Sequence, residues 1–180
     1  MLSLDGTKVY FSREHTGNWF EYATLSTPFA LSTAGSFVEL PTSNSWMTAM
    51  NNLQSKSGMW APAWSYDGTK YYSKNEGSRV IRQSTAGTAW DASTFSYANK
   101  SFDINPTARD PSGTQVHYDF GITFNQSGTR MYVLKDYMWE YALSTAYDIS
   151  TASYVSLMKF PPDTNGDNVN CRSGRFSADG

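Results

Sequence analysis

The chain has 180 residues and a formal net charge of −2, from 14 Lys and Arg against 16 Asp and Glu. This length corresponds to one domain. The near-neutral charge, without any run of Lys or Arg, excludes the basic surface that binds a nucleic-acid backbone. No apolar stretch reaches the ~20 residues that span a bilayer, so we expect neither nucleic acid nor membrane insertion.

The apolar residues are mainly aromatic, since 10 Phe, 12 Tyr and 6 Trp outnumber Ile, Leu and Val together. Aromatic side chains favour strands, so the composition indicates a β-rich chain. The 24 Ser and 18 Thr predict a surface of hydroxyl groups, as on many extracellular and virion proteins. Cys171 is the single cysteine, which excludes an intramolecular disulfide.

A motif recurs along the chain. Ser-x-Asp-Gly-Thr-Lys-x-Tyr occupies residues 3–10 and 65–72, Asn-Gln-Ser-Gly-Thr-Arg-Met-Tyr occupies residues 125–132, and another copy begins at Ser177. The motif glycines are 62, 60 and 52 residues apart. These intervals exceed the ~40 to 50 residues of common propeller blades and leave room for insertions.

Each repeat is expected to form four antiparallel strands. The first runs into the Asp-Gly or Ser-Gly turn, whose glycine can take the positive φ of a tight hairpin. The second follows the turn with the two-residue alternation of a sheet. The first strand is expected over 61–65, 120–124 and 175–177, the third over 19–22, 80–82 and 138–141, and the fourth over 36–40, 95–97 and 154–160.

The predicted fold class is therefore all-β, with β-propeller-type antiparallel blades. We expect about three four-stranded blades and a fragment of a fourth. The expected divisions are blade 1 over about 1–44, an insert with a short helix or loop over 45–60, blade 2 over 61–104, blade 3 over 116–160, and a linker with a partial blade over 161–180. Because three blades do not close a ring, the ring is expected to be part of a longer propeller or to be closed by oligomerisation.

The repeats remain similar after the second strand. Glu21-Tyr-Ala-Thr-Leu-Ser-Thr matches Glu140-Tyr-Ala-Leu-Ser-Thr, whereas the second repeat has Arg82-Gln83 in place of Glu-Tyr. The Ser-x-Asp-Gly-Thr-Lys unit resembles WD40-like and TolB-like propeller repeats. Its continuation is similar to propeller repeats of bacteriophage structural proteins and marine bacterial surface proteins.

This resemblance implies a non-enzymatic structural or binding module at a virion or extracellular surface. We expect a phage structural protein that decorates a capsid or tail or contributes to host attachment. Its partners would be other protein chains, either copies of itself or virion proteins, and surface glycans in addition. The alternatives are a glycan-binding lectin-type propeller and a fragment of a propeller hydrolase.

The motifs predict no catalytic site. His15 and His117 have no Gly-x-Ser-x-Gly nucleophile elbow beside them and no zinc-binding spacing. The aspartates of the repeated turn, Asp5, Asp67 and Asp179, are expected to accept hydrogen bonds from nearby backbone N–H groups. Because Glu21 and Glu140 also recur, their role is expected to be architectural.

Trp46 and Trp60 are the candidate binding residues, because they lie in the non-repeated insert. An exposed indole is a good platform for a sugar ring or a protein partner. In contrast, Trp19, Trp90 and Trp139 occupy or adjoin repeated positions and are expected in the core.

A Ca²⁺ site is the one cofactor site that the sequence suggests. Asp163, Asn165 and Asp167 place oxygen ligands at alternate positions, as the start of a calcium loop does. However, the expected glycine and the bidentate glutamate of that loop are replaced by Asn168 and Gly174. A polar turn is the alternative.

Overall fold

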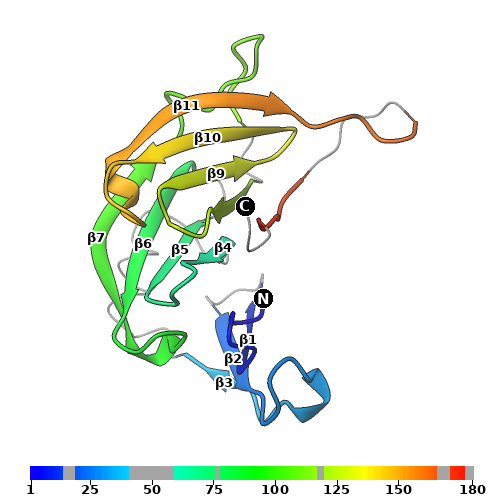
Figure 1. Ribbon diagram of the computed structural model, residues 1–180, viewed down its shortest axis with the longest axis vertical. Helices are drawn as coiled ribbons and strands as arrows, with labels where there is room; N and C mark the ends of the chain where they lie inside the picture. The colour runs from blue at the N-terminus through cyan, green and yellow to red at the C-terminus, as the bar shows by residue number, and fades with distance from the viewer. Residues whose placement is uncertain (14–18, 41–58, 76–77, 117–119, 166–170, 177–180) are drawn as a thin grey trace.

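A computed structural model describes residues 1–13, 19–40, 59–75, 78–116, 120–165 and 171–176. Three antiparallel sheets follow one another along the chain and form an arc (Figure 1). The predicted all-β class with propeller-type blades is therefore confirmed. Among the residues just given, no helix is long and apolar enough to cross a membrane.

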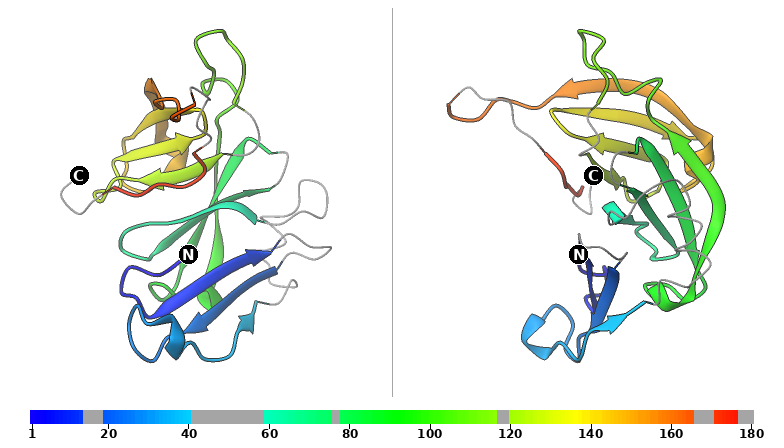
Figure 2. Two further views of the ribbon diagram at one scale, coloured as in Figure 1. Left: turned by 90° about the vertical axis from the view of Figure 1, so that its right-hand side faces the viewer. Right: turned by 180° about the vertical axis from the view of Figure 1, so that it is seen from behind.

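The strands of each sheet lie side by side in chain order. The first sheet contains β1 (Lys8–Arg13), β2 (Trp19–Thr24) and β3 (Val38–Glu39); the second contains β4 (Met59–Trp64), β5 (Lys70–Asn75), β6 (Val80–Ala86) and β7 (Phe95–Asp103); the third contains β8 (Gly121–Phe124), β9 (Arg130–Leu134), β10 (Tyr137–Leu143) and β11 (Ala152–Lys159). In the second and third sheets, β4 and β8 lie on the concave side of the arc, and β7 and β11 on its convex side (Figures 1 and 2).

The predicted strand positions agree with these sheets to within a few residues, with two larger differences. β4 begins inside the expected insert and ends one residue before Ser65. Residues 175–176 have no strand assignment, although a strand was expected over 175–177. The expected helix of the insert lies outside the described residues.

The strand register corrects the alignment of the two Glu-Tyr pairs. Tyr10 pairs with Tyr22 across β1 and β2, and the equivalent Tyr132 pairs with Glu140 across β9 and β10. Glu140 is thus equivalent to Tyr22 and not to Glu21. The cause is one additional residue between Glu21 and the following turn in the first repeat.

The repeated turn has the predicted hydrogen bonds. Asp67 Oδ1 accepts from Ser65 Oγ at 2.6 Å and from the Thr69 N–H at 2.9 Å. Asp5 makes the same bonds in the first repeat. In the third repeat, an asparagine takes the serine position and a serine takes the aspartate position. There, Asn125 Oδ1 accepts from the Arg130 N–H at 2.9 Å. The prediction of a turn-stabilising role is confirmed for Asp5 and Asp67, whereas Asp179 lies outside the described residues.

These turn carboxylates make stability depend on pH. Burial raises the pKa of Asp67, but hydrogen bonds from Ser65 and Thr69 outweigh it and hold the pKa below its usual value of 3.8. The pKa of Asp5 is lowered for the same reasons. A carboxylate with a depressed folded pKa stabilises the fold above its unfolded pKa, and this contribution is lost as the pH falls through the folded pKa.

We therefore expect the melting temperature to fall as the pH drops below about 4. The Asp67→Asn variant keeps an acceptor in the turn but has no charge to lose. Its deficit against the parent protein should be largest near neutral pH and should shrink below pH 3.8. Thermal melts followed by circular dichroism between pH 7 and pH 2 would measure this, and a constant deficit across that range would contradict it.

The ring of an aromatic residue, here called the closing aromatic residue, packs over the glycine of each repeated turn. The turn glycines have φ of 69° to 70°, and the aromatic residues have φ of 60° to 64°. Each aromatic N–H donates to the glycine carbonyl at 2.8 to 2.9 Å. The pairs are Gly6 with Phe29, Gly68 with Trp90, and Gly128 with Tyr147. A Cβ at Gly68 would lie 2.4 Å from the Trp90 ring, so the ring is seated where only glycine leaves room.

Most of the core lies at the two interfaces between neighbouring sheets, and a smaller cluster on the first sheet contains Val9, Ala23 and Leu25. At the first interface, the Tyr10 ring lies 5.3 Å from the Trp64 ring. At the second, the Tyr72 ring lies 4.3 Å from the Phe124 ring. All four side chains are buried, with at most 8% of their surface exposed. The aromatic composition of the chain is therefore explained by the packing between sheets.

Short 3-10 helices follow the closing aromatic residues. They are η1 (Leu31–Thr33), η2 (Ala92–Thr94) and η3 (Ile149–Thr151). The aspartates before η2 and η3 form ion pairs with the preceding sheet: Asp91 lies 3.4 Å from Lys8, and Asp148 contacts Lys100. These contacts orient each sheet against the next.

Candidate functional site

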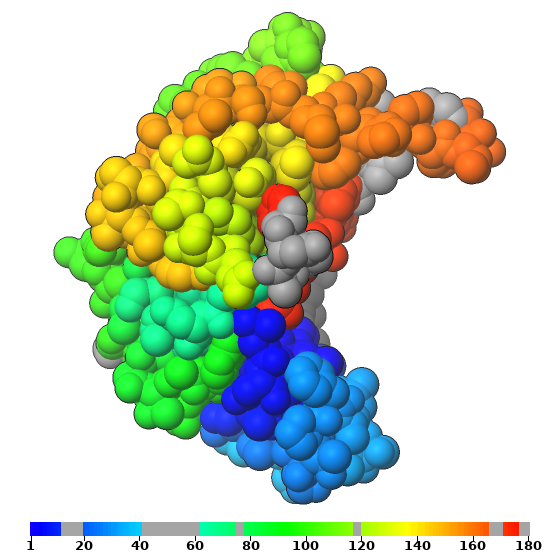
Figure 3. Space-filling view, viewed as in Figure 1, coloured from blue at the N-terminus to red at the C-terminus, as the bar shows by residue number. Residues whose placement is uncertain are grey.

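A cleft of about 530 Å³ lies where the three sheets meet on the concave side of the arc. The space-filling view shows the two ends of the described chain close together there (Figure 3). This position corresponds to the axis around which propeller blades are arranged. The lining residues are Met1, Leu2, Pro62, Ala63, Trp64, Tyr66, Trp90, Ile122, Thr123, Phe124, Arg172, Ser173, Gly174 and Arg175.

The wall nearest the C-terminus is formed by residues 171–176, which cross over the third sheet. The Cys171 N–H donates to the Lys135 carbonyl at 2.9 Å. The segment then passes Gly121 so closely that a Cβ there would lie 2.0 Å from the Arg172 carbonyl oxygen. Glycine at the start of β8 is therefore required for this close approach.

The end of this segment is attached to both the second and the third sheet. The Tyr66 hydroxyl donates to the Phe176 carbonyl at 2.9 Å. The Phe176 ring lies 4.6 Å from the ring of Tyr132 on β9. These contacts hold the neighbouring Arg175 at the cleft.

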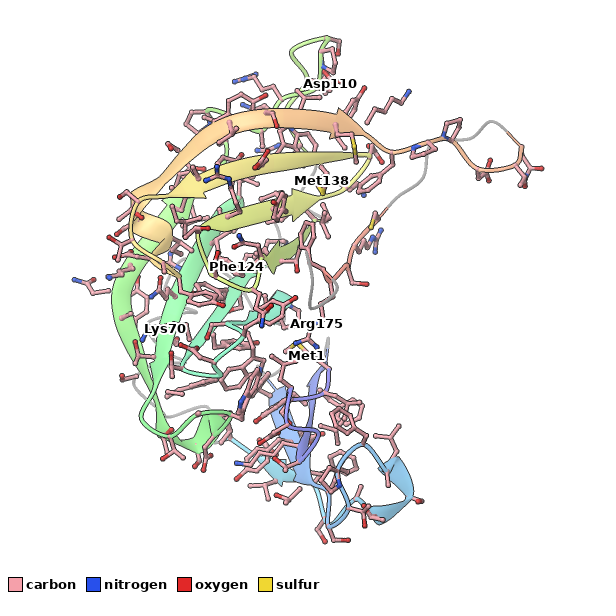
Figure 4. All side chains as sticks on the ribbon, in the orientation of Figure 1. Met1, Lys70, Asp110, Phe124, Met138 and Arg175 are labelled. Carbon is pink, nitrogen blue, oxygen red and sulfur yellow. The ribbon has the colours of Figure 1, made fainter. Side chains whose placement is uncertain are left out.

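The cleft combines positive charge with aromatic walls. The Arg175 guanidinium lies 5.1 Å from the centre of the Tyr66 ring, a cation–π arrangement. Arg172 lines the same wall, and Trp64 and Phe124 form the apolar floor. Figure 4 shows Arg175 beside Met1 on the concave side. Among the residues that the structure describes, the lining contains no Asp or Glu.

The described lining also contains no His or Cys. In the part of the chain that the structure describes, no three His, Cys, Asp or Glu residues gather as a metal site. The polar groups of the described lining are guanidinium ions and the hydroxyls of Thr123, Ser173 and Tyr66, of which the Tyr66 hydroxyl donates to Phe176; aromatic faces complete the walls. This arrangement can bind an anion with an apolar face.

The predicted tryptophan site is not tested by the described residues. Trp46 lies outside them, and for Trp60 they give the backbone, which belongs to β4. The predicted core positions of Trp90 and Trp139 are confirmed, because they are 9% and 2% exposed. Trp90 also contributes to the cleft wall. The side chain of Trp19 lies outside the described residues.

Two of the predicted Ca²⁺ ligands, Asp163 and Asn165, do not line the cleft. Asp163 and Asn165 are exposed, and the Asn165 N–H donates to Asp163 Oδ1 at 2.9 Å, as in a polar turn. Asp167 lies outside the described residues. The Ca²⁺ hypothesis therefore stays a prediction.

The sequence analysis did not identify Tyr66, Arg172 or Arg175 as site residues. Tyr66 occupies the variable position of the repeated turn, and the arginines showed no grouping along the chain. One signal was available: Arg175 and Phe176 precede Ser177, so they occupy the same repeat positions as the cleft residues Ala63 and Trp64.

No family model matches the chain, and no curated protein is similar to it in sequence. Solved structures do resemble the fold. A proposed 6-phosphogluconolactonase from Bacteroides uniformis has 11% identity and a TM-score of 0.45, over 92% of this chain and 43% of that protein. The periplasmic gluconolactonase of Pseudomonas aeruginosa has 11% identity and a TM-score of 0.43, over 91% of this chain and 42% of that protein.

A proposed 6-phosphogluconolactonase from Bacteroides fragilis has 12% identity and a TM-score of 0.41, over 92% of this chain and 57% of that protein. The chain thus spans between 42% and 57% of the length of these three proteins. The similarity concerns the fold alone.

These comparisons correct the prediction of a phage structural protein. The similar solved structures are named as lactonases, which are hydrolases, and no virion protein is among them. No family model supports a phage, WD40-like or TolB-like assignment either. Short repeat motifs that form turns and sheet cores are shared by propellers of unrelated function, which is why the resemblance was misleading. The antiparallel sheets support a β-propeller-like fold and no finer assignment.

Proposed function

We propose that the cleft binds an acidic carbohydrate, a ligand with one carboxylate and one apolar ring face. The observation that carries this proposal is the Arg175 guanidinium, which lies 5.1 Å from the centre of the Tyr66 ring at the aromatic wall of the cleft. Guanidinium groups bind carboxylates through two parallel hydrogen bonds. The apolar face of a sugar ring packs on aromatic side chains.

The size and position of the cleft support a small ligand. Pockets for small molecules are typically about 300 to 1,000 Å³, and this one is about 530 Å³. We propose a binding role for the cleft, because the described lining offers a guanidinium group and aromatic faces that together recognise such a ligand. This is the lectin-type alternative, with the ligand narrowed to acidic sugars.

The test is isothermal titration of the protein with glucuronate and with glucose, which share a ring and differ in the carboxylate. We expect glucuronate to bind at least about tenfold more tightly than glucose, because a hydrogen bond to a charged group contributes about 1.5 to 3 kcal/mol. Equal affinity for the two sugars, or heat from neither, would contradict the proposal.

Arg175→Gln should weaken glucuronate binding about tenfold or more and should leave glucose binding unchanged. The control is Arg109→Gln. Arg109 is exposed, and its guanidinium donates to the Gly113 carbonyl at 2.9 Å in a loop that does not line the cleft. A similar loss in both variants would point to a general charge effect and would count against a carboxylate site at Arg175.

A further inference from the structure

The two interfaces between sheets use the same hydrogen bond at equivalent positions. The Tyr10 hydroxyl of the first sheet donates to the Trp90 carbonyl of the second. The Tyr72 hydroxyl of the second sheet donates to the Tyr147 carbonyl of the third at 2.7 Å. In each case, a tyrosine from one sheet reaches the closing aromatic residue of the next.

In the first sheet, the equivalent acceptor is the Phe29 carbonyl, and no tyrosine hydroxyl of the described residues donates to it. Phe29 is equivalent to Trp90 and Tyr147, yet 60% of its surface is exposed, against 9% for Trp90. Leu31, at the first position of η1, is also 60% exposed, whereas the equivalent Ile149 is fully buried. We call the side of the first sheet that is turned away from the second sheet the head face. Its exposed apolar residues are Phe11, Phe29, Leu31 and Phe37.

In the third sheet, the equivalent donor is a tyrosine hydroxyl on its outer side. Tyr132 is equivalent to Tyr10 and Tyr72, and its hydroxyl makes no hydrogen bond within the described chain. Glu140 is equivalent to Gln83, whose side-chain oxygen accepts from the Ile149 N–H at 3.1 Å across the second interface. We call this side of the third sheet the tail face. It comprises Tyr132, Met138, Glu140 and Met158.

The charged residues of the two outer faces differ from those at the interfaces inside the chain. Asp91 and Asp148 follow the closing aromatic residues inside the chain and pair with lysines, but Ala30 takes their place at the head face. On the tail face, Arg130 is already paired with Glu140 at 3.0 Å. The head face also carries Glu21 and Glu39, which are paired across β2 and β3 on the same side as Phe11, so docking brings these glutamates toward the Arg130–Glu140 ion pair.

We propose that the head face of one copy of the chain docks on the tail face of a second copy. The Tyr132 hydroxyl of the second copy donates to the Phe29 carbonyl, which repeats the contact made twice within the chain. The two faces lie at opposite ends of the arc (Figure 2), so the association is head to tail. Docking depends on these two faces and does not require ligand binding in the cleft.

Phe176 competes with this docking. Leu2 pairs with Val9 as Trp64 pairs with Tyr71, so Leu2 is the equivalent of Trp64. Inside the chain, the Trp64 ring packs on Tyr10. In the docked pair, Leu2 of one copy should therefore pack on Tyr132 of the other. Phe176 occupies that position on Tyr132. Removal of its ring should therefore favour association.

Sedimentation velocity at increasing concentration tests the proposal on the 180-residue protein. We expect reversible association that is reduced at least tenfold by Phe29→Asp on the head face and by Tyr132→Asp on the tail face. Phe176→Ala should strengthen it. The control is Tyr154→Asp: Tyr154 is 42% exposed, but it lies beside Tyr141 on the side of β11 turned toward the second sheet.

A mixture of the Phe29→Asp and Tyr132→Asp proteins retains one intact head face and one intact tail face. It should form a dimer that neither variant forms alone, which distinguishes head-to-tail docking from a symmetric contact. Circular dichroism confirms that each variant is folded. A monomeric parent protein that stays monomeric as Phe176→Ala, association unaffected by both face variants, or equal loss with Tyr154→Asp would each overturn the proposal.

Discussion

Gly68→Ala is expected to lower the free energy of unfolding by about 2 to 5 kcal/mol. Gly68 has φ of +70°, a conformation that costs an L-residue about 1 to 2 kcal/mol. The new Cβ would also lie 2.4 to 2.5 Å from three ring atoms of Trp90, and overpacking of this kind costs about 1 to 3 kcal/mol. Because Trp90 is fixed by the Trp64 ring 5.3 Å away, its indole cannot easily move aside.

Gly113→Ala is the matched control for this substitution. Gly113 has φ of +85°, but nothing lies within 4 Å of the position of its added Cβ. It should therefore show the backbone cost without the steric cost. Thermal and urea melts should give a clearly larger loss for Gly68→Ala, by about 1 to 3 kcal/mol. Equal losses for the two variants would show that the aromatic closure of the turn contributes no steric constraint.

Tyr72→Ala is expected to have a similar effect, a loss of about 3 to 5 kcal/mol. Tyr72 is fully buried between the second and third sheets, where its ring packs on Phe124 and its hydroxyl donates to the Tyr147 carbonyl. The substitution removes a whole aromatic ring from a closed interface and leaves a buried carbonyl without its donor.

Two further variants separate these contributions. Tyr72→Phe keeps the ring and should cost about 1 to 3 kcal/mol, the value for an unsatisfied buried carbonyl. Tyr132→Ala removes the equivalent tyrosine from the tail face, where no complete sheet covers it, and should cost less than Tyr72→Ala. If urea denaturation gave equal losses for Tyr72→Ala and Tyr132→Ala, the packing between sheets would not be the main stabilising contact.

The fold could be predicted from the sequence, but the candidate site could not. Tyr66 and Phe176 are 110 residues apart in the chain, yet their hydrogen bond holds Arg175 at the cleft. No local spacing relates such residues, because the contact depends on how residues 171–176 cross β8 at Gly121. The tryptophans of the insert were chosen because they fall outside the repeat, and that criterion does not report where a side chain lies in space.

The one-residue error in aligning Glu21 with Glu140 has a similar origin. Sequence identity favoured an alignment of the two Glu-Tyr pairs. The register of the strands, however, is fixed by the hydrogen bonds next to the turn. The Thr7 carbonyl accepts from the Leu25 N–H, and the Thr129 carbonyl accepts from the Leu143 N–H. The two leucines are therefore equivalent, and so are residues at the same distance before each of them. An extra residue then places the two glutamates in different registers.

The repeated sequence by itself determined the local structure of this protein. Asp-Gly with a preceding serine forms the turn, alternating aromatic residues form the strands, and the recurrence of both predicts propeller-type blades, because each of these depends on neighbours within a few residues. The tertiary structure alone decided what the surfaces can do. Phe29 and Trp90 have the same backbone conformation, but one is exposed and the other buried, because burial depends on whether another sheet lies against it.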